Sequence, residues 1–301
     1  MPTEMDVRLF EHILNFRDAT QTTNARHPSS QQFIRGRLYR SARPDEATQS
    51  DKSSLLNAYK FKSIIDLRTD SEHLEQTNKH AASSKHREQV STSPLTEPSD
   101  PARPLRIPGI KYFDISLNGS AYRRALIKQL TWGQTAKLAG LYVTGYRKEA
   151  ISVLGTNVMA PRGLVGLARD SLIHSQAEVK EVFDVLADDA NYPILVHCTQ
   201  GKDRTGLVVL LVLLLLGAPL EAIEEDYVMS ERELAPEREE KLNEVRSIGL
   251  PDEFAGCPKH WVEEVARFIQ EEFGGVERYL EKCGVGVEVR HKVRQVLTAG
   301  R

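Results

Sequence analysis

The sequence predicts an α/β protein with a mostly parallel central sheet and helices on both faces. Short apolar runs typical of buried strands alternate along the chain with longer amphipathic segments typical of helices. The most apolar run, residues 207–216, follows a short strand-like segment and a connecting loop, which is the order of a buried strand and a core helix. Nothing divides the 301 residues cleanly, so we expect one domain over residues 1–301.

The first half of the chain supplies three of the expected strands. Residues 38–40 and residues 61–67 are expected to be strands, separated by a helix at 53–60. A third strand is expected at 110–115, where apolar residues return after a polar stretch. We expect Ile64 and Ile65, in the second of these segments, to be central.

A polar stretch, residues 71–104, separates the second and third strands. It is rich in Ser, Thr, Pro, His, Lys and Glu and has few large apolar residues. Such a segment cannot bury enough apolar surface to offset the conformational entropy lost on ordering. We therefore expect a mobile insert within the domain.

Helices are expected for most of the remaining chain. Residues 121–170 carry large apolar side chains throughout, and residues 178–190 form a clear amphipathic helix that leads into a strand at 194–196. Gly217 and Pro219 end the apolar helix, and Pro219 begins another. Three further helices are expected near the C-terminus, separated by glycines: 259–272, 275–283 and 287–298.

Overall charge excludes some classes of partner. Forty basic and 42 acidic residues give a net charge of −2, which offers no support for nucleic acid or an anionic membrane surface as a general partner, although local charge can still matter. The run at 207–216 is much shorter than the roughly 20 residues of a membrane span, so no transmembrane segment is expected. No pattern indicates an oligomeric state.

Cysteine usage and the N-terminal residues predict a cytoplasmic location. Cys198, Cys257 and Cys283 are odd in number and widely spaced, so neither a disulfide framework nor a zinc site is indicated. The N-terminal residues lack the basic start and apolar core of a secretion signal. A reducing compartment would also protect a reactive thiol.

The loop between the strand at 194–196 and the apolar helix contains the chemistry. Cys198 opens it and Arg204 follows six positions later. A loop that turns from a strand into a helix directs backbone N–H groups and the positive end of the helix dipole toward a common point, where a dianion can bind. The same field stabilises a thiolate at Cys198. Arg204 can hold two phosphate oxygens, and Gly201 would let the backbone approach the bound anion.

This loop, His-Cys-Thr-Gln-Gly-Lys-Asp-Arg-Thr-Gly at residues 197–206, resembles the signature of the cysteine-dependent protein tyrosine phosphatases. It is most similar to the tyrosine/serine phosphatase branch, which is dual-specificity-like and includes mycobacterial enzymes with lipid-phosphatase activity. Further stretches resemble that branch at 16–19, 36–42, 64–68 and 226–227. The resemblance implies a protein tyrosine phosphatase fold with helical additions. It also implies that helices within 121–170 cover the active site as a lid. The alternative interpretation is that these helices only pack against the core, and the sequence favours neither.

The resemblance and the chemistry together assign roles within the loop. Cys198 is the expected nucleophile, and Arg204 binds the phosphate and stabilises the transition state. We expect phosphate contacts from the loop as a whole: Thr199, Gln200, Gly201, Lys202, Asp203, Arg204 and Thr205. The Thr205 hydroxyl could donate to the cysteine sulfur, and His197 fixes the loop rather than acting as a base.

The general acid has two candidates. The sequence lacks the Trp-Pro-Asp tripeptide that supplies the acid in most tyrosine phosphatases, and Asp203 resembles the acid proposed inside the loop of the mycobacterial relatives. Asp114, at the end of an expected strand, is the alternative. Lys202 would be an extra cation at the rim of the site, suited to lipid head groups; a solvated lysine that balances Asp203 is the other interpretation.

The predicted function is hydrolysis of phosphomonoesters through a phosphocysteine intermediate, with no metal and no cofactor. Candidate substrates are phosphotyrosine, phosphoserine or phosphothreonine in proteins, and phosphoinositides. Two alternatives belong to other classes: a catalytically silent phosphate-binding module, and a rhodanese-like sulfurtransferase, which also places a cysteine on a strand-to-helix loop.

Overall fold

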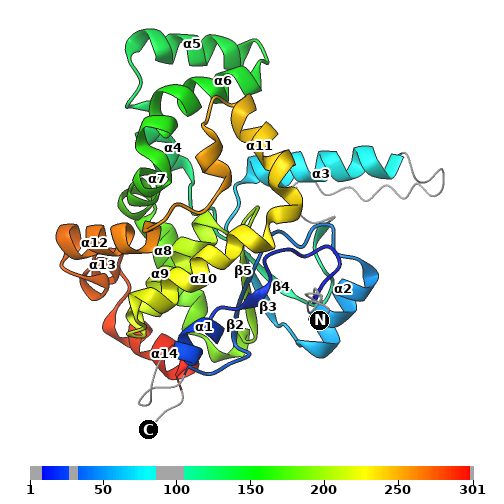
Figure 1. Ribbon diagram of the computed structural model, residues 1–301, viewed down its shortest axis with the longest axis vertical. Coiled ribbons are helices and arrows are strands. Elements are labelled where there is room, and N and C mark those ends of the chain that lie inside the picture. The colour runs from blue at the N-terminus through cyan, green and yellow to red at the C-terminus, as the bar shows by residue number, and fades with distance from the viewer. Residues whose placement is uncertain (1–8, 27–32, 86–104, 299–301) are drawn as a thin grey trace, which may run out of the picture.

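The computed structural model describes residues 9–26, 33–85 and 105–298. In this part of the chain a five-stranded sheet has the order β1-β2-β5-β3-β4. Strands β2, β5, β3 and β4 run parallel to one another, and only the edge strand β1 is antiparallel. The predicted mostly parallel sheet is therefore confirmed (Figure 1). The strands are β1 (Arg17–Asp18), β2 (Leu38–Ser41), β3 (Ser63–Asp66), β4 (Lys111–Asp114) and β5 (Ile194–His197).

Strand β5 lies at the centre of the sheet, and its four residues are buried. It pairs with β2 on one side, where His197 is opposite Ser41, and with β3 on the other, where His197 is opposite Asp66. Because these strands are parallel, the carboxyl ends of β2, β3 and β5 lie side by side at one edge of the sheet. The loop that begins at Cys198 leaves from that edge.

The two faces of the sheet are covered differently. On one face Ile65 and Val196 belong to a large apolar core formed with helices α8, α9, α10, α12, α13 and α14. On the other face Ile64 and Leu195 belong to a smaller core that is closed by the N-terminal segment and by a π-helical turn at Ser54–Ala58. Alternate residues of a strand point to opposite faces, which explains the division.

The α-helices have the following bounds: α1 Gln21–Arg26, α2 Gln49–Ser53, α3 Asp70–Lys85, α4 Ser120–Ile127, α5 Trp132–Val143, α6 Arg147–Leu154, α7 Ala160–His174, α8 Gln176–Leu186, α9 Asp203–Leu215, α10 Leu220–Glu233, α11 Arg238–Ser247, α12 Trp261–Phe273, α13 Val276–Lys282 and α14 Val287–Leu297. The expected apolar helix is α9. Nearly all of its side chains are buried because it crosses the centre of the larger core.

The expectation of a mobile insert from residue 71 is wrong for residues 71–85, which form most of α3. The first turn of this helix is tied to the rest of the protein: Glu72 pairs with Arg204, and His73 is buried beside Asp66. These polar contacts order a segment whose composition is poor in apolar residues. The remainder of the expected insert, residues 86–104, lies outside the described residues.

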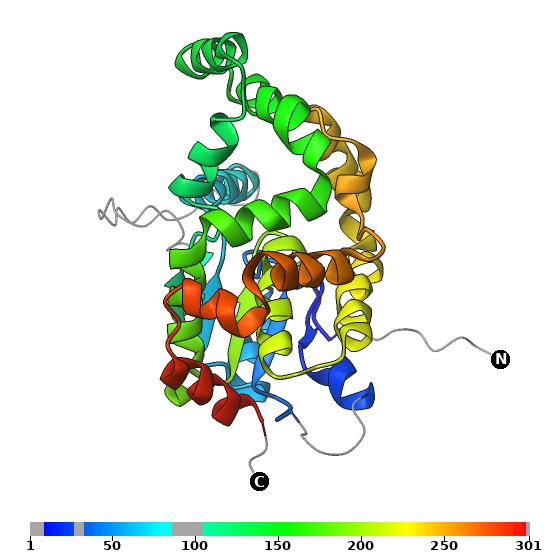
Figure 2. The ribbon, with the colours of Figure 1, turned by 90° about the vertical axis from the view of Figure 1, so that its left-hand side faces the viewer.

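The segment 121–170 is helical, as expected. It comprises α4, α5, α6, the π-helical turn Gly155–Met159 and α7. Helix α5 lies on α6 at the end of the molecule's long axis (Figures 1 and 2). By length and composition alone, Arg147–His174 is a candidate membrane span of 28 residues with a mean hydropathy of 1.2. Gly163 inside it has φ 61° and ψ 177°, which breaks the helical path.

Candidate active site

The phosphate loop, defined here as residues 198–204, leaves the central strand and enters the first turn of α9. Cys198 is buried and lines a cavity of about 490 Å³, and Arg204 lines the same cavity. The first backbone hydrogen bond into α9 runs from Gly206 to the carbonyl of Lys202, and no described side chain caps the helix. The first amides of α9 therefore remain available to an anion beside the cysteine sulfur.

Gly201 is required where the phosphate loop passes the end of β2. It has φ 64°, and a Cβ at this position would lie 2.0 Å from the carbonyl oxygen of Ser41. The phosphate loop therefore passes close to the end of β2 at this residue, and the expected approach of the backbone to a bound anion stays a prediction. Glycine is the residue that tolerates both the left-handed backbone and the contact.

Arg204 is held by a carboxylate that lies outside the loop. Its two terminal nitrogens donate to Glu72 of α3 at 2.7 and 2.5 Å, and the same carboxylate accepts from the Thr199 hydroxyl at 2.6 Å. Burial alone would raise the pKa of Glu72, but the charge and hydrogen bonds of Arg204 outweigh it and hold that pKa well below its usual range. Glu72 stays ionised and fixes the plane of the guanidinium.

Replacing Glu72 by Gln tests this positioning role. The amide keeps the size of the side chain but loses the charge that orients Arg204, so we expect kcat/KM for a phosphomonoester to fall roughly 10-fold to 100-fold. Glu288→Gln, on α14 at an exposed pair with Lys292 and away from the cavity, is the matched control and should be near wild type. Equal losses in the two variants would contradict the role of Glu72.

The back of the phosphate loop rests on a buried charge network. Asp226 of α10 accepts from Arg17 Nε at 2.6 Å and from Arg40 at 2.5 Å. Arg40 also donates to the carbonyl of Gly201 at 2.6 Å. Burial disfavours the charge of Asp226, yet Arg17 and Arg40 outweigh it and lower the pKa of the carboxyl. The network connects β1, β2 and α10 to the loop.

His197 and Arg68 brace the loop from the β3 side. Imidazole Nε2 lies 3.3 Å from Asp66, and Nδ1 lies 3.1 Å from the carbonyl of Cys198. Burial lowers the pKa of His197, so the ring is neutral at physiological pH, which agrees with a role in fixing the loop. Arg68 binds both Asp66 and Asp45, and is thus committed to buried ion pairs.

The residues that support the phosphate loop come from the stretches that resemble the tyrosine/serine phosphatase branch: Arg17, Arg40, the segment 64–68 and Asp226. A family model described as the tyrosine phosphatase family matches residues 9–299. The chain belongs to the tyrosine phosphatase family.

Two curated relatives match about half of the chain. It is 30% identical over 154 residues to a tyrosine-protein phosphatase of Nostoc commune, which covers 46% of this chain and 52% of that protein. It is 28% identical over 139 residues to the triple specificity protein phosphatase PtpB of Mycobacterium tuberculosis, which covers 41% of this chain and 49% of that one. The chain thus spans about half the length of these relatives.

Among solved structures, the chain is similar to the core catalytic domain of the PP-IP phosphatase SIW14 from S. cerevisiae, determined in complex with citrate. The identity is 17%, the match covers 80% of this chain and 92% of that one, and the TM-score is 0.33.

The two candidate acids of this tyrosine phosphatase family member lie in different places. Asp203 lines the cavity, and its side chain is 44% exposed. Asp114 does not line the cavity; it lies at the end of β4 and pairs with Arg106. Position therefore favours Asp203.

Lys202 is not a cation at the rim, and that expectation is wrong. Its side chain is 1% exposed, and Nζ donates to the carbonyl of Gly256 at 2.6 Å and lies 3.0 Å from Asp203. The buried ammonium group thus has one hydrogen-bonded carbonyl and one ion-paired carboxylate. The pairing with Asp203 agrees with the alternative interpretation, although the lysine is buried rather than solvated.

The other expected phosphate contacts divide into two groups. Thr199 and Gln200 line the cavity with Cys198, whereas Gly201 and Thr205 do not. The Thr205 hydroxyl is buried, and it has no hydrogen-bond partner among the described residues. A donor of this kind below the loop suits the expected contact with the cysteine sulfur.

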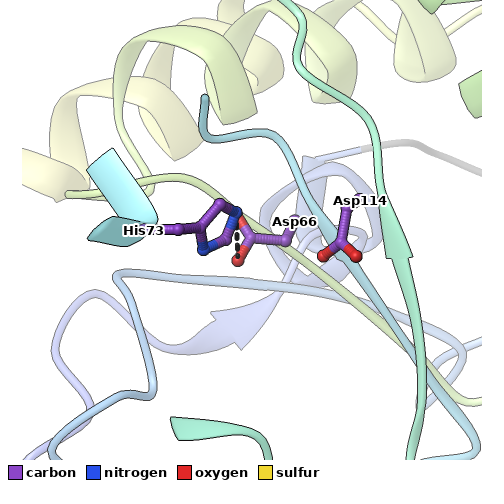
Figure 3. A group of neighbouring side chains, drawn as sticks. All are labelled: Asp66, His73 and Asp114. Carbon is purple, nitrogen blue, oxygen red and sulfur yellow. Dashed lines mark ion pairs between the residues drawn. The ribbon is translucent and has the colours of Figure 1, made fainter. Parts of the chain in front are cut away.

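One group of side chains could be taken for a metal site. Asp66, His73 and Asp114 place potential ligand atoms within 4.8 Å of one another, with an ion pair between His73 and Asp66 (Figure 3). Both carboxylates, however, already face cations: Arg68 binds Asp66, and Arg106 binds Asp114. A divalent ion would have to displace these guanidinium groups, so we assign the group a structural role.

Apolar side chains form much of the cavity wall beyond the phosphate loop. The segment 121–170 contributes Tyr122, Ile151, Met159, Leu164 and Leu167, and the region after α10 contributes Val245, Ile248, Leu250, Phe254 and Trp261. Most of the cations in the wall are paired with carboxylates, as Arg43 is with Glu237 and Lys241 with Glu244. Apart from Arg204, the part of the cavity wall that a substrate would contact is therefore mainly apolar, with few unpaired cations.

Proposed function

We propose that this protein hydrolyses phosphomonoesters through a phosphocysteine intermediate. The observation that carries the proposal is that Cys198 and Arg204 line one cavity at the N-terminus of α9. Amides and a guanidinium stabilise both the thiolate and the phosphate beside it. The sequence signature and the family membership support the same chemistry.

The reaction proceeds in two displacement steps. The Cys198 thiolate forms a bond to phosphorus while the bond from phosphorus to the leaving oxygen breaks, and Asp203 gives that oxygen its proton. A water molecule then attacks phosphorus and gives a proton to the Asp203 carboxylate. The bond from phosphorus to sulfur breaks, phosphate leaves, and the Thr205 hydroxyl stabilises the departing thiolate. Arg204 balances the charge on the phosphoryl oxygens in both steps.

Phosphotyrosine in proteins is the proposed principal substrate. A cavity of about 490 Å³ with an apolar wall suits an aromatic ring attached to a single phosphate. The names of the relatives, tyrosine-protein phosphatase and triple specificity protein phosphatase, agree with a protein substrate and leave room for phosphoserine and phosphothreonine. Phosphoinositides are the second proposed class of substrate. An exposed Lys202 at the rim would have favoured them, but this side chain is buried.

A cytoplasmic location is part of the proposal. Cys198, Cys257 and Cys283 are all free thiols, and a nucleophilic thiolate is best preserved in a reducing compartment.

A substrate panel tests the proposed function. Phosphotyrosine peptides, phosphoserine peptides and phosphoinositide micelles are incubated with the protein, and free phosphate is measured with Cys198→Ser as the blank. We expect the highest kcat/KM with phosphotyrosine peptides. Thiosulfate sulfurtransfer without phosphate release, or binding of esters without hydrolysis, would contradict the proposal.

The acid assignment makes a separate prediction. Asp203→Asn removes the proton donor, so we expect kcat to fall about 10²-fold to 10⁴-fold for alkyl phosphates and less for p-nitrophenyl phosphate, whose leaving group needs little protonation. Asp114→Asn should retain wild-type kcat with both. A loss in Asp203→Asn that is the same for both leaving groups would remove Asp203 from the role of acid.

A further inference from the structure

Helix α5 presents an apolar stripe to solvent, where a surface helix normally presents polar side chains. Trp132, Ala136, Ala139 and Val143 recur at intervals of four, three and four residues, so they lie on one face. All four are exposed, and Trp132 and Val143 are 93% and 85% exposed. We call these four residues the α5 stripe.

The stripe is not the inner face of the helix. Leu138 and Leu141, on the opposite side of α5, pack toward the small core that contains Tyr122, Leu126 and Val153. The orientation of α5 is thus fixed by its own apolar contacts, with the α5 stripe directed away from the protein. Two flanking aromatic side chains, Tyr142 and Tyr146, are also 63% and 58% exposed.

Positive charge is concentrated on α5 and on the residues that flank it. Residues 128–150 contain four basic side chains and a single acidic one, Glu149, although the whole chain has a net charge of −2. The four cations are exposed, and within the described part of the chain none of them forms an ion pair with a carboxylate: Lys128, Lys137, Arg147 and Lys148. An exposed tryptophan and exposed tyrosines beside cations match the interface of an anionic bilayer.

The position of α5 permits this contact. The helix lies at one end of the long axis, and it runs across that axis in both views, horizontal in Figure 1 and nearly end-on in Figure 2. A helix in this position can lie flat in a membrane plane while the body of the protein stands away from it. No element of the described chain extends beyond it in that direction.

We propose that the α5 stripe docks the protein on anionic membrane surfaces, with Trp132 and Val143 inserted at the level of the head groups. A second copy of this chain is a poorer occupant, because two such surfaces would bring like charges together. The docking goes beyond the proposed phosphatase function and does not depend on it. Membrane docking would hold the cavity near substrates that are themselves at the membrane.

Vesicle binding tests the proposal with the full chain. Sedimentation with phosphatidylcholine vesicles that contain about a third phosphatidylserine should remove the protein from solution, and phosphatidylcholine alone should not. Binding should weaken strongly between about 0.05 and about 0.5 M salt because exposed charges are screened. Trp132 fluorescence should shift to shorter wavelength on binding, since the other tryptophan, Trp261, is 1% exposed and stacked on Tyr227.

Variants of exposed residues separate the stripe from the rest of the surface. Trp132→Ala should weaken vesicle binding about tenfold or more, and Arg147→Glu with Lys148→Glu should weaken it by roughly fivefold for each cation removed, or further. Val287→Ala, at a 65% exposed apolar residue on α14, is the matched control and should bind as wild type. Hydrolysis of a soluble phosphotyrosine peptide should be unchanged in these variants.

Three results would overturn the proposal. These are no sedimentation with anionic vesicles at low salt, binding that Trp132→Ala leaves intact, and a wild-type dimer in analytical ultracentrifugation that Trp132→Ala converts to a monomer. The last result would assign the stripe to a second copy of the chain. Because peptide hydrolysis is measured separately, failure of docking is distinguishable from failure of the proposed function.

Discussion

Cys198→Ser should lose phosphatase activity by a factor on the order of 10⁴ or more, while it still binds substrate. A serine hydroxyl at this position is not ionised near neutral pH and cannot form the phosphocysteine intermediate. The first amides of α9 and Arg204 remain, so the dissociation constant for a phosphotyrosine peptide should change by only a few-fold. Phosphate release and peptide binding measure the two quantities in the same preparation.

Cys257→Ser is the control for this substitution. Burial raises the pKa of Cys257 to about 11, so this thiol is protonated at physiological pH, and its Sγ contacts the carbonyl of Tyr227 rather than the cavity. Its activity should be near wild type. Acid quenching of the wild-type enzyme during turnover should leave phosphate covalently bound, and Cys198→Ser should show none. Substantial activity in Cys198→Ser, or labelling of another residue, would contradict the mechanism.

Much of the fold could be predicted from local sequence patterns. Strand β5 and helix α9 are continuous apolar runs, so their burial follows from composition and length alone. The ends of the loop between them follow directly, because the strand and the helix that flank it can both be located in the sequence. This is why Cys198 and Arg204 could be assigned to one site before the structure was known.

Residues whose roles depend on distant partners could not be assigned in this way. Glu72 lies 132 positions before Arg204 and sits in a stretch that composition marked as an insert. The one local signal was Thr69 three residues earlier: its backbone N–H donates to the Glu72 carboxylate, which is one half of a helix-capping box. Lys202 was expected at the rim because only its neighbours in the loop can be read from the sequence. The carbonyl of Gly256, which accepts a hydrogen bond from the buried ammonium group, is 54 positions away and could not be predicted.

The largest expected effect on stability comes from Asp226→Asn. This substitution preserves the shape of the side chain and removes the one carboxylate shared by Arg17 and Arg40, whose side chains are 5% and 1% exposed. Two buried guanidinium groups would then repel each other without a counter-charge. We expect the free energy of unfolding to fall by about 3–5 kcal/mol, measured by urea denaturation.

Asp252→Asn gives the matched control, because it breaks an arginine–aspartate pair of the same length, 2.6 Å, on the surface. Arg246 and Asp252 are 54% and 57% exposed, and water and salt screen their attraction, so no resolvable change in stability is expected. Asp226→Asn should also weaken phosphate binding, because Arg40 links the network to the carbonyl of Gly201 in the phosphate loop. If both variants were equally stable, the buried network would not support the loop, and the similarity of these stretches to the family would need another physical cause.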